Sequence, residues 1–202
     1  MRKLIVLSFI SLDGVMQAPG GQEEDTSGGF QYGGWTAPFW EEFAHKTMVG
    51  QMSSDFDLLL GRKTYDIFAA YWPLAENNKG PIAASLNKAT KYVVTRRPVN
   101  NNWEKTISIG GNAIEEIKKL KAGDGPELQV HGSGNLIQTL LKHDLVDELW
   151  LKTFPVTLGP GKKLFAEGTI AAAFELIESK TSPKGIVVAS YKRAGEVKTG
   201  TL

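Results

Sequence analysis

The chain has 202 residues, of which 42% are hydrophobic and 22% charged, and it carries a net charge of +1 at pH 7 and no cysteine. Its length and composition are typical of a globular protein with one large domain or two small ones. The charge balance argues against a broad surface for nucleic acid or an anionic membrane, and the lack of cysteine excludes disulfides, thiolate metal sites and a cysteine nucleophile.

Residues 3–10 are the first expected element, a run of Leu, Ile, Val and Phe typical of a central strand buried on both faces. The run follows a basic start, but it is short, contains Ser8 and reaches Asp13 without a small-residue cleavage site. We therefore interpret it as a strand and not as a signal peptide. No apolar run approaches the ~20 residues of a membrane-spanning helix, so we expect a cytoplasmic protein.

Three residues suited to ligand binding follow this strand, namely Ser11, Asp13 and Gly14. In open α/β sheets, ligand-binding groups stand at such strand ends. An Asx turn that closes the strand explains the same residues equally well.

Residues 18–35 form a Gly-rich, acidic stretch, and loops of this length are usually functional or disordered. A helix is expected to follow from about residue 38 to about residue 51. Trp35 and Trp40 are the candidates for the wall of a pocket that takes a flat ring, and core packing is the alternative.

A strand-to-helix junction is expected within residues 55–68, where a buried strand ends at Gly61. Arg62 and Thr64 follow and offer a cation and a hydroxyl to phosphate oxygens. After a short helix, a strand at residues 91–98 ends in Thr95 and Arg96. The same chemistry thus recurs at a second strand end, and a solvated charge cluster is the alternative.

The stretch LQVHGSGNLIQTLL, residues 128–141, changes from a strand to a helical period at Gly132, Ser133 and Gly134, with Asn135 as the expected helix cap. Such a junction directs unpaired N–H groups and the positive end of the helix dipole at one point, where phosphate binds. A plain strand-to-helix turn is the alternative.

The remaining chain is expected to form a strand at residues 102–109, a helix capped by Asn112, a strand broken at Pro155 and a terminal antiparallel hairpin at residues 174–193. These elements predict one α/β domain over residues 1–193 and a polar tail over residues 194–202. The three histidines lack the spacing of metal ligands, so no metal site is expected.

Five motifs, in this order and spacing, resemble those of the dihydrofolate reductase superfamily: FISLDGVM, DLLLGRKTYD, KYVVTR, LQVHGSGNLIQTLL and DLVDELWLKTFPVTLGPGKKLF. The closer resemblance is to the C-terminal reductase domain of the bifunctional riboflavin-biosynthesis deaminase-reductase. It covers nearly all of residues 1–193. It implies a three-layer dihydrofolate-reductase-like fold with a mostly parallel sheet, an NADPH site, and hydride transfer to a C=N or sugar-carbonyl centre of a pterin, folate or ribosylated pyrimidine.

The resemblance also implies site residues. Ser11, Asp13 and Gly14 match the substrate-side strand end of that branch. From the residues themselves, Asp13 is the catalytic candidate, as the carboxylate at this strand end, and Trp35 and Trp40 are further substrate-side candidates. The residues matching the cofactor site are Gly61, Arg62, Thr64, Thr95, Arg96, Gly132, Ser133, Gly134, Asn135 and Leu136. Arg96 and Thr95 fall on the side of the 2′-phosphate.

One departure motivates an alternative function. The folate-reducing enzymes hold the pterin with an acid on the first helix, and neither Glu41 nor Glu42 matches that position. A non-catalytic nucleotide-binding or regulatory protein on the same fold is therefore the second hypothesis. The partner expected in either case is a small molecule.

A homodimer is also expected, partly from the resemblance. Leu149, Trp150 and Leu151 are consecutive large apolar residues in one strand, so the outward one needs cover. A helix of the same chain lying over Trp150 is the alternative.

Overall fold

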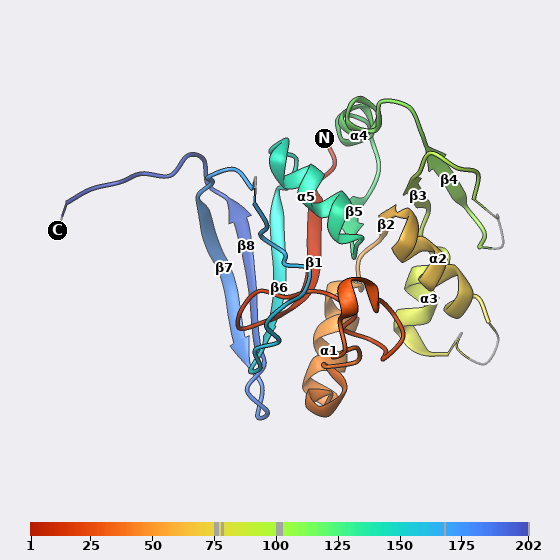
Figure 1. Ribbon diagram of the computed structural model, residues 1–202. Helices are drawn as coiled ribbons and strands as arrows, with labels where there is room; N and C mark the ends of the chain where they lie inside the picture. Colours follow the sequence, from red (N-terminus) through yellow and green to blue (C-terminus); the bar gives the residue numbers. More distant parts are fainter. Residues whose placement is uncertain (75–76, 78, 100–102, 168, 202) are drawn as a thin grey trace.

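A single eight-stranded sheet runs through the structure (Figure 1), a computed structural model that describes residues 1–74, 77, 79–99, 103–167 and 169–201. The strand order is β4-β3-β2-β5-β1-β6-β8-β7. The strands are β1 (Leu4–Ser11), β2 (Phe56–Gly61), β3 (Lys91–Val94), β4 (Thr106–Ile109), β5 (Glu127–Val130), β6 (Glu148–Phe154), β7 (Phe174–Thr181) and β8 (Val187–Arg193).

The sheet is parallel from β4 to β6, and β8 pairs antiparallel with both β6 and β7. β1 lies between β5 and β6, and seven of its eight residues are buried. The expected central first strand, mostly parallel sheet and C-terminal antiparallel pair are confirmed.

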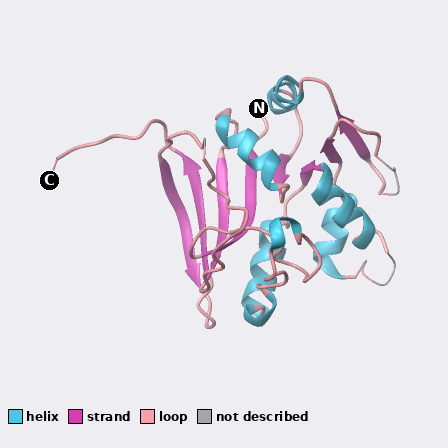
Figure 2. Ribbon diagram, in the orientation of Figure 1, coloured by secondary structure: helices cyan, strands magenta, loops and turns pink. Residues whose placement is uncertain are grey.

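Helices cover both faces of the sheet (Figure 2). They are α1 (Glu42–Gln51), α2 (Arg62–Tyr71), α3 (Gly80–Lys88), α4 (Ala113–Ala122) and α5 (Gly134–Lys142), with short 3₁₀ turns η1 (Ser27–Gly29) and η2 (Ala37–Phe39). On one face, α4 and α5 pack against β1, β5 and β6 through residues such as Ile117, Ile137 and Leu140. On the other face, α2 and α3 pack against β2 and β3, and α1 adjoins α3.

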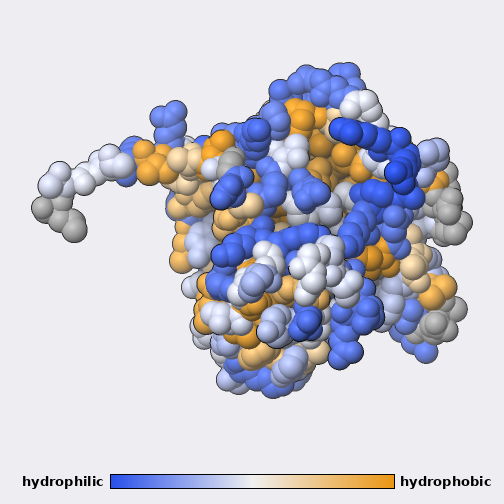
Figure 3. Space-filling view, viewed as in Figure 1, coloured by the Kyte–Doolittle hydropathy of each residue, from blue (hydrophilic) through white to orange (hydrophobic). Residues whose placement is uncertain are grey.

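The alternation of side chains along β1 explains this layering. Leu4 and Val6 belong to the core under α4 and α5, and Phe9 faces the opposite side, where it packs with Phe154. Each fully buried Leu or Val contributes about 1.5–3 kcal/mol to stability. Figure 3 shows that hydrophilic side chains cover most of the face seen there, with apolar areas between them.

Two expected helix starts are wrong. The helix predicted from residue 38 is interrupted, because Trp40 is extended between η2 and α1 and its ring packs edge-on against Phe9. The predicted cap Asn135 lies inside α5, since Ser133 occupies the cap position and Gly134 already begins the helix. The helix therefore begins two residues earlier than a cap at Asn135 predicts.

The strands β3 and β4 are shorter than predicted. β3 ends at Val94 because the Thr95 hydroxyl accepts a hydrogen bond from the Arg97 N–H (3.1 Å) and closes a turn. β4 begins at Thr106, and the start of its predicted range, residue 102, lies outside the described residues. No helix in the described part of the chain has the length and apolarity to span a membrane.

Candidate functional site

The β2–α2 and β5–α5 turns touch each other at the carboxyl edge of the sheet. The Gly61 N–H donates to the Gly132 carbonyl (3.1 Å). A Cβ on Gly61 would overlap the Ser133 side chain, and a Cβ on Gly132 would overlap the Thr64 hydroxyl. Both glycines are therefore required for packing the two turns together, which joins the two motifs that the sequence singled out separately.

Gly134 differs from these two glycines. A Cβ at Gly134 would meet only the Met16 sulfur, at an ordinary contact distance of 3.7 Å. The residue begins α5 and has no positive φ. A side chain is therefore compatible with the fold at this position, and the lack of one leaves the helix N-terminus open.

The N-termini of α2 and α5 form an electropositive edge. Neither helix has a side-chain cap or an acidic residue in its first turn. Their first N–H groups are therefore free of side-chain acceptors, and the helix dipoles add partial positive charge. This arrangement is suited to a diphosphate. The predicted residues Asn135 and Leu136 lie in the first turn of α5, and Leu136 is buried against the core.

The cationic side chains near this edge differ in whether they already have partners within the protein. Arg62 pairs with Asp66 (2.8 Å), and its Nη1 donates to the Pro98 carbonyl (2.8 Å), so it anchors the segment after β3. Lys63 pairs with Asp25 (2.5 Å). Arg96 is exposed, and its side chain makes no hydrogen bond or ion pair within the described residues. Arg96 is thus the predicted cation that remains available to a ligand.

Asp13 anchors a loop. Its carboxylate accepts from the Ser11 hydroxyl (2.5 Å) and from the backbone N–H groups of Leu158 (3.1 Å) and Gly159 (2.8 Å). The Ser11 hydrogen bond is the main cause that lowers the pKa of Asp13 below its ordinary value. This geometry fits an ionised carboxylate that holds the loop in place better than it fits a proton donor. The catalytic role of Asp13 stays a prediction. Gly14 adopts φ 82°, which favours glycine.

The two tryptophans predicted to line a pocket lie in different environments. Trp35 is 7% exposed, its indole N–H donates to the Gln17 carbonyl (2.8 Å), and its ring packs edge-on against Phe154. Trp35 is therefore a core residue in this structure. Trp40 is 39% exposed and contacts Phe9 (ring centroids 6.2 Å apart), so it lies at the surface beside the start of α1.

The sequence reasoning missed a buried polar group beneath α1. Lys152 pairs with Phe9 in register, is buried, and its Nζ donates to the Gln51 side chain. Burial lowers the pKa of Lys152 to about 7. Burial, and then the charge of Lys152, lowers the pKa of His131 to about 3. A lysine in the middle of a strand expected to be buried was the available signal.

We predict that Lys152 makes stability depend on pH. Its pKa is about 7 in the folded protein, against 10.5 ordinarily, so between these values the unfolded chain holds a proton that the folded chain lacks. The free energy of unfolding therefore rises with pH across this window. Lys152→Met should flatten the rise by up to about 1.4 kcal/mol per pH unit. Urea unfolding at several pH values measures this.

A second lysine supplies the control for this prediction. Burial lowers the pKa of Lys91 to about 8, so Lys91 contributes a separate rise at higher pH that Lys152→Met should leave in place. Parallel curves for wild type and Lys152→Met between pH 7 and 8 would contradict the assignment.

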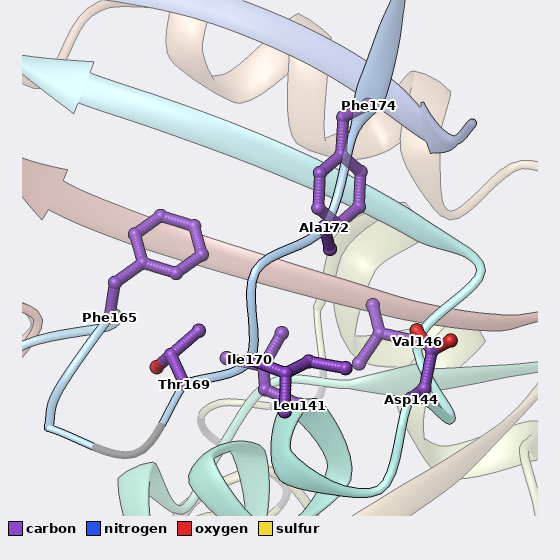
Figure 4. A pocket seen from close by; sticks show the side chains of 8 residues that line it. All are labelled: Leu141, Asp144, Val146, Phe165, Thr169, Ile170, Ala172 and Phe174. Atoms are coloured by element: carbon purple, nitrogen blue, oxygen red, sulfur yellow. The ribbon is translucent and has the colours of Figure 1, made fainter. Parts of the chain in front are cut away.

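An apolar pocket of about 240 Å³ lies away from this edge (Figure 4). It is lined by the end of α5 and the segment before β7, namely Leu141, Asp144, Val146, Phe165, Thr169, Ile170, Ala172 and Phe174. None of the predicted site residues lines it. Within the described residues, no three His, Asp or Glu side chains are grouped closely enough to hold a metal ion.

The family assignment follows from the sequence as a whole. The family described as the RibD C-terminal domain matches residues 2–188. The chain belongs to the RibD C-terminal domain family. Two relatives come from Bacillus subtilis (strain 168): the uncharacterized protein YyaP is 32% identical over 66% of this chain and 72% of YyaP, and the uncharacterized protein YwjB is 27% identical over 83% of this chain and 85% of YwjB.

Solved structures show the fold of this RibD C-terminal domain protein. A putative riboflavin biosynthesis protein from Shewanella sp. PV-4 has a TM-score of 0.66 and 23% identity, covering 95% of this chain and 99% of its own. A pyrimidine reductase-like protein from Corynebacterium diphtheriae has a TM-score of 0.62 and 13% identity, covering 96% of this chain and 93% of its own. Dihydrofolate reductase from Enterococcus faecalis, complexed with NADP(H), has a TM-score of 0.59 and 17% identity, covering 95% of this chain and 96% of its own. The predicted dihydrofolate-reductase-like fold is confirmed.

Proposed function

We propose that this protein is an NADPH-dependent reductase that transfers a hydride to a C=N or sugar-carbonyl centre of a pterin, folate or ribosylated pyrimidine. The observation that carries the proposal is the contact between the two glycine turns, which brings two uncapped helix N-termini to one edge of the sheet. Membership of the RibD C-terminal domain family supports it, as does the fold shared with a dihydrofolate reductase complexed with NADP(H).

The residues present fit a dinucleotide. The open N-terminus of α5 at Gly134 would hold the pyrophosphate, since a helix N-terminus without an acidic side chain binds anions. Arg96 would meet the 2′-phosphate with a charge-assisted hydrogen bond. Gly61, Gly132 and Thr64 would keep the two turns together. The bound nicotinamide would supply the hydride, and the protein would supply position and electrostatics.

The substrate would bind on the α1 side of the carboxyl edge. Phe9 and Trp40 provide aromatic surface there, and the strand that carries Phe9 ends at Ser11, with Asp13 and Gly14 in the turn that follows. Because Asp13 holds the loop at residues 158–159, it would shape this side of the site through the loop.

The test combines binding with turnover. Calorimetry should detect saturable binding of NADPH, and NADPH absorbance should fall with at least one substrate among dihydrofolate, pterin analogues and a ribosylated pyrimidinone. Lack of NADPH binding would contradict the cofactor site, whereas binding without oxidation of NADPH by any of these compounds would contradict the proposed reaction.

One observation favours a non-catalytic nucleotide-binding protein instead. Neither acid near the start of α1 stands free to hold a ring: Glu42 pairs with Lys46 (2.7 Å) on the surface, and Glu41 accepts from the Lys184 N–H (3.3 Å). This alternative predicts that NADPH binds but that none of the candidate substrates oxidises it.

We also propose a homodimer, with a different surface from the one first predicted. Leu149 and Leu151 are buried in the core, and Trp150 lies inside the sheet on β6 and donates to Glu148 (2.9 Å). Exposed apolar side chains lie instead on the edge strand β7, where Leu176 and Ile177 are 52% and 49% exposed. An edge strand with exposed apolar side chains is a site of chain association.

Light scattering at micromolar concentration tests the dimer. We expect twice the chain mass of 22.0 kDa for the wild type and the monomer mass for Ile177→Glu, because a charge on the edge strand opposes pairing. Lys180→Glu on the same strand, in place of an already charged residue, is the matched control. A wild-type mass of 22.0 kDa would contradict the dimer.

A further inference from the structure

The chain ends in an exposed C-terminal arm, residues 196–202. Its residues 196–201 lie outside any helix or strand and make no hydrogen bond or ion pair within the described part of the chain. In Figure 1 the arm extends away from the sheet and from the helices. Val197 is a large apolar side chain on this arm and is 50% exposed. A chain end of this kind is poorly ordered unless a binding surface ties it down.

The root of the arm is fixed beside the apolar pocket. The Ala194 N–H donates to the Ala173 carbonyl (2.8 Å), and the Ala173 N–H donates to the Gly195 carbonyl (2.9 Å). Arg193 donates to the same Gly195 carbonyl and pairs with Asp144 (2.8 Å). Ala173 stands between two residues that line the pocket, and Asp144 lines it as well. The arm therefore leaves the body of the protein next to the pocket, in a direction that these bonds set.

One wall of the pocket is held in place from α5. The Gln138 side chain accepts from the Ala166 N–H (3.3 Å) and donates to the Lys163 carbonyl (3.2 Å), so it fixes the backbone on both sides of Phe165. Phe165 and Ile170 are 45% and 37% exposed, and Figure 4 shows both beside the pocket. The pocket is therefore preformed, and it exposes apolar side chains to water in the way that binding surfaces do.

The lining of the pocket suits an aliphatic side chain better than a polar metabolite. Its volume of about 240 Å³ is below the roughly 300–1,000 Å³ of small-molecule sites, in which a few polar groups orient the ligand. The polar side chains in this lining already have partners, since Thr169 donates to the Ala166 carbonyl (2.9 Å) and Asp144 pairs with Arg193 (2.8 Å). A valine would leave no polar group of its own unpaired there.

The pocket adjoins the edge strand that we propose for the dimer. Phe174 begins β7, and Leu176, two residues further on, faces the same side of the sheet because side chains alternate along a strand. Leu176 is 52% exposed and pairs in register with Tyr191, which packs with Phe174 against the core on the α5 side. A two-fold contact uses the same surface patch of both copies. Two copies that meet at the start of β7 therefore bring each arm root next to the pocket of the partner.

We propose that the pocket receives the C-terminal arm of a second copy, with Val197 packed on Ile170 and the two arms exchanged across a two-fold axis near the start of β7. This inference rests on the proposed homodimer and does not depend on the reductase activity. Exchange keeps each arm root as it is in the structure. The chain's own arm, in contrast, would have to turn back just after Gly195, whose carbonyl is held by two donors.

Because the chain has no cysteine, a single introduced cysteine can report where the arm lies. Protein carrying a nitroxide at Thr199→Cys, without isotope label, is mixed with isotope-labelled wild type. The nitroxide should broaden the Ile170 methyl resonances of the labelled copies, since the arm of one copy lies in the pocket of the other. A nitroxide at Lys88→Cys, on exposed α3 at the other end of the sheet, is the control and should leave these resonances unchanged.

Variants of the arm give a second readout. Removal of residues 196–202 and Val197→Asp should each raise the dissociation constant of the dimer roughly tenfold or more, as expected when a buried valine is lost, whereas Thr201→Asp should change it little. The arm makes no hydrogen bond to the body of the protein, so circular dichroism of these variants should match the wild type. Dilution series followed by light scattering measure the dissociation constants.

The outcomes separate this inference from the homodimer itself. If the wild type is a dimer but the truncated chain has the same dissociation constant and the Ile170 resonances stay sharp, exchange is overturned and the homodimer stands. Broadening of Ile170 only by a nitroxide on the same copy would show that the arm folds back on its own chain, and would overturn exchange as well. A monomeric wild type would contradict both proposals and leave the reductase proposal untouched.

Discussion

Replacing Gly134 with valine is expected to lower the affinity for NADPH roughly a hundredfold or more while leaving the unfolding temperature close to that of the wild type. A Cβ at this position meets only the Met16 sulfur at 3.7 Å, so the fold tolerates a side chain. The valine methyls would instead occupy the space in front of the α5 N-terminus and hold the pyrophosphate away from the backbone N–H groups. Loss of hydrogen bonds to a charged group accounts for the size of the effect.

A second glycine in a helix supplies the control. Gly50 in α1 has no atom within 4 Å of an added Cβ, and Gly50→Val should leave NADPH affinity unchanged. Calorimetric titration of both variants, with circular dichroism to verify folding, distinguishes a binding turn from a structural one. Unaltered NADPH binding by Gly134→Val would remove the main support for the cofactor site.

Replacing Arg96 with alanine is expected to weaken NADPH roughly tenfold or more and NADH very little. Arg96 is an exposed cation just after β3, and its side chain has no partner among the described residues, so its guanidinium is available to a 2′-phosphate, which NADH lacks. The measurement is the ratio of the two dissociation constants for wild type and variant.

Arg62→Ala is the informative contrast. Arg62 binds Asp66 and the carbonyl of Pro98, so its removal should loosen the segment after β3 and lower the affinity for both cofactors by similar factors. Equal losses of affinity for NADPH and NADH in Arg96→Ala would instead show that Arg96 does not contact the 2′-phosphate.

The sequence predicted the parts of the fold that depend on local pattern. The apolar run of β1 and the change of period around Gly132 and Gly134 were sufficient to predict a central strand and a strand-to-helix turn at the carboxyl edge. These features depend on neighbouring residues, and the positions of the parallel strand ends follow from the sheet type.

Contacts between distant parts of the chain could not be predicted in this way. Asp13 is held by backbone N–H groups at residues 158–159, which no local pattern reveals. Lys152 meets Gln51 from α1, and its isolation depends on tertiary packing. Trp35 is of a residue type common in ligand pockets, but the fold of the Gly-rich stretch buries it against Phe154.

The most direct test of the cofactor site is a titration of isotope-labelled protein with NADPH, followed by the chemical shifts of the backbone amides. The proposed site predicts that the largest saturable shifts occur at Arg62, Gly134 and Asn135, where the N-termini of α2 and α5 meet the edge of the sheet. Saturable shifts confined to residues around the apolar pocket, such as Phe165 and Ile170, or no saturable shift at all, would contradict it.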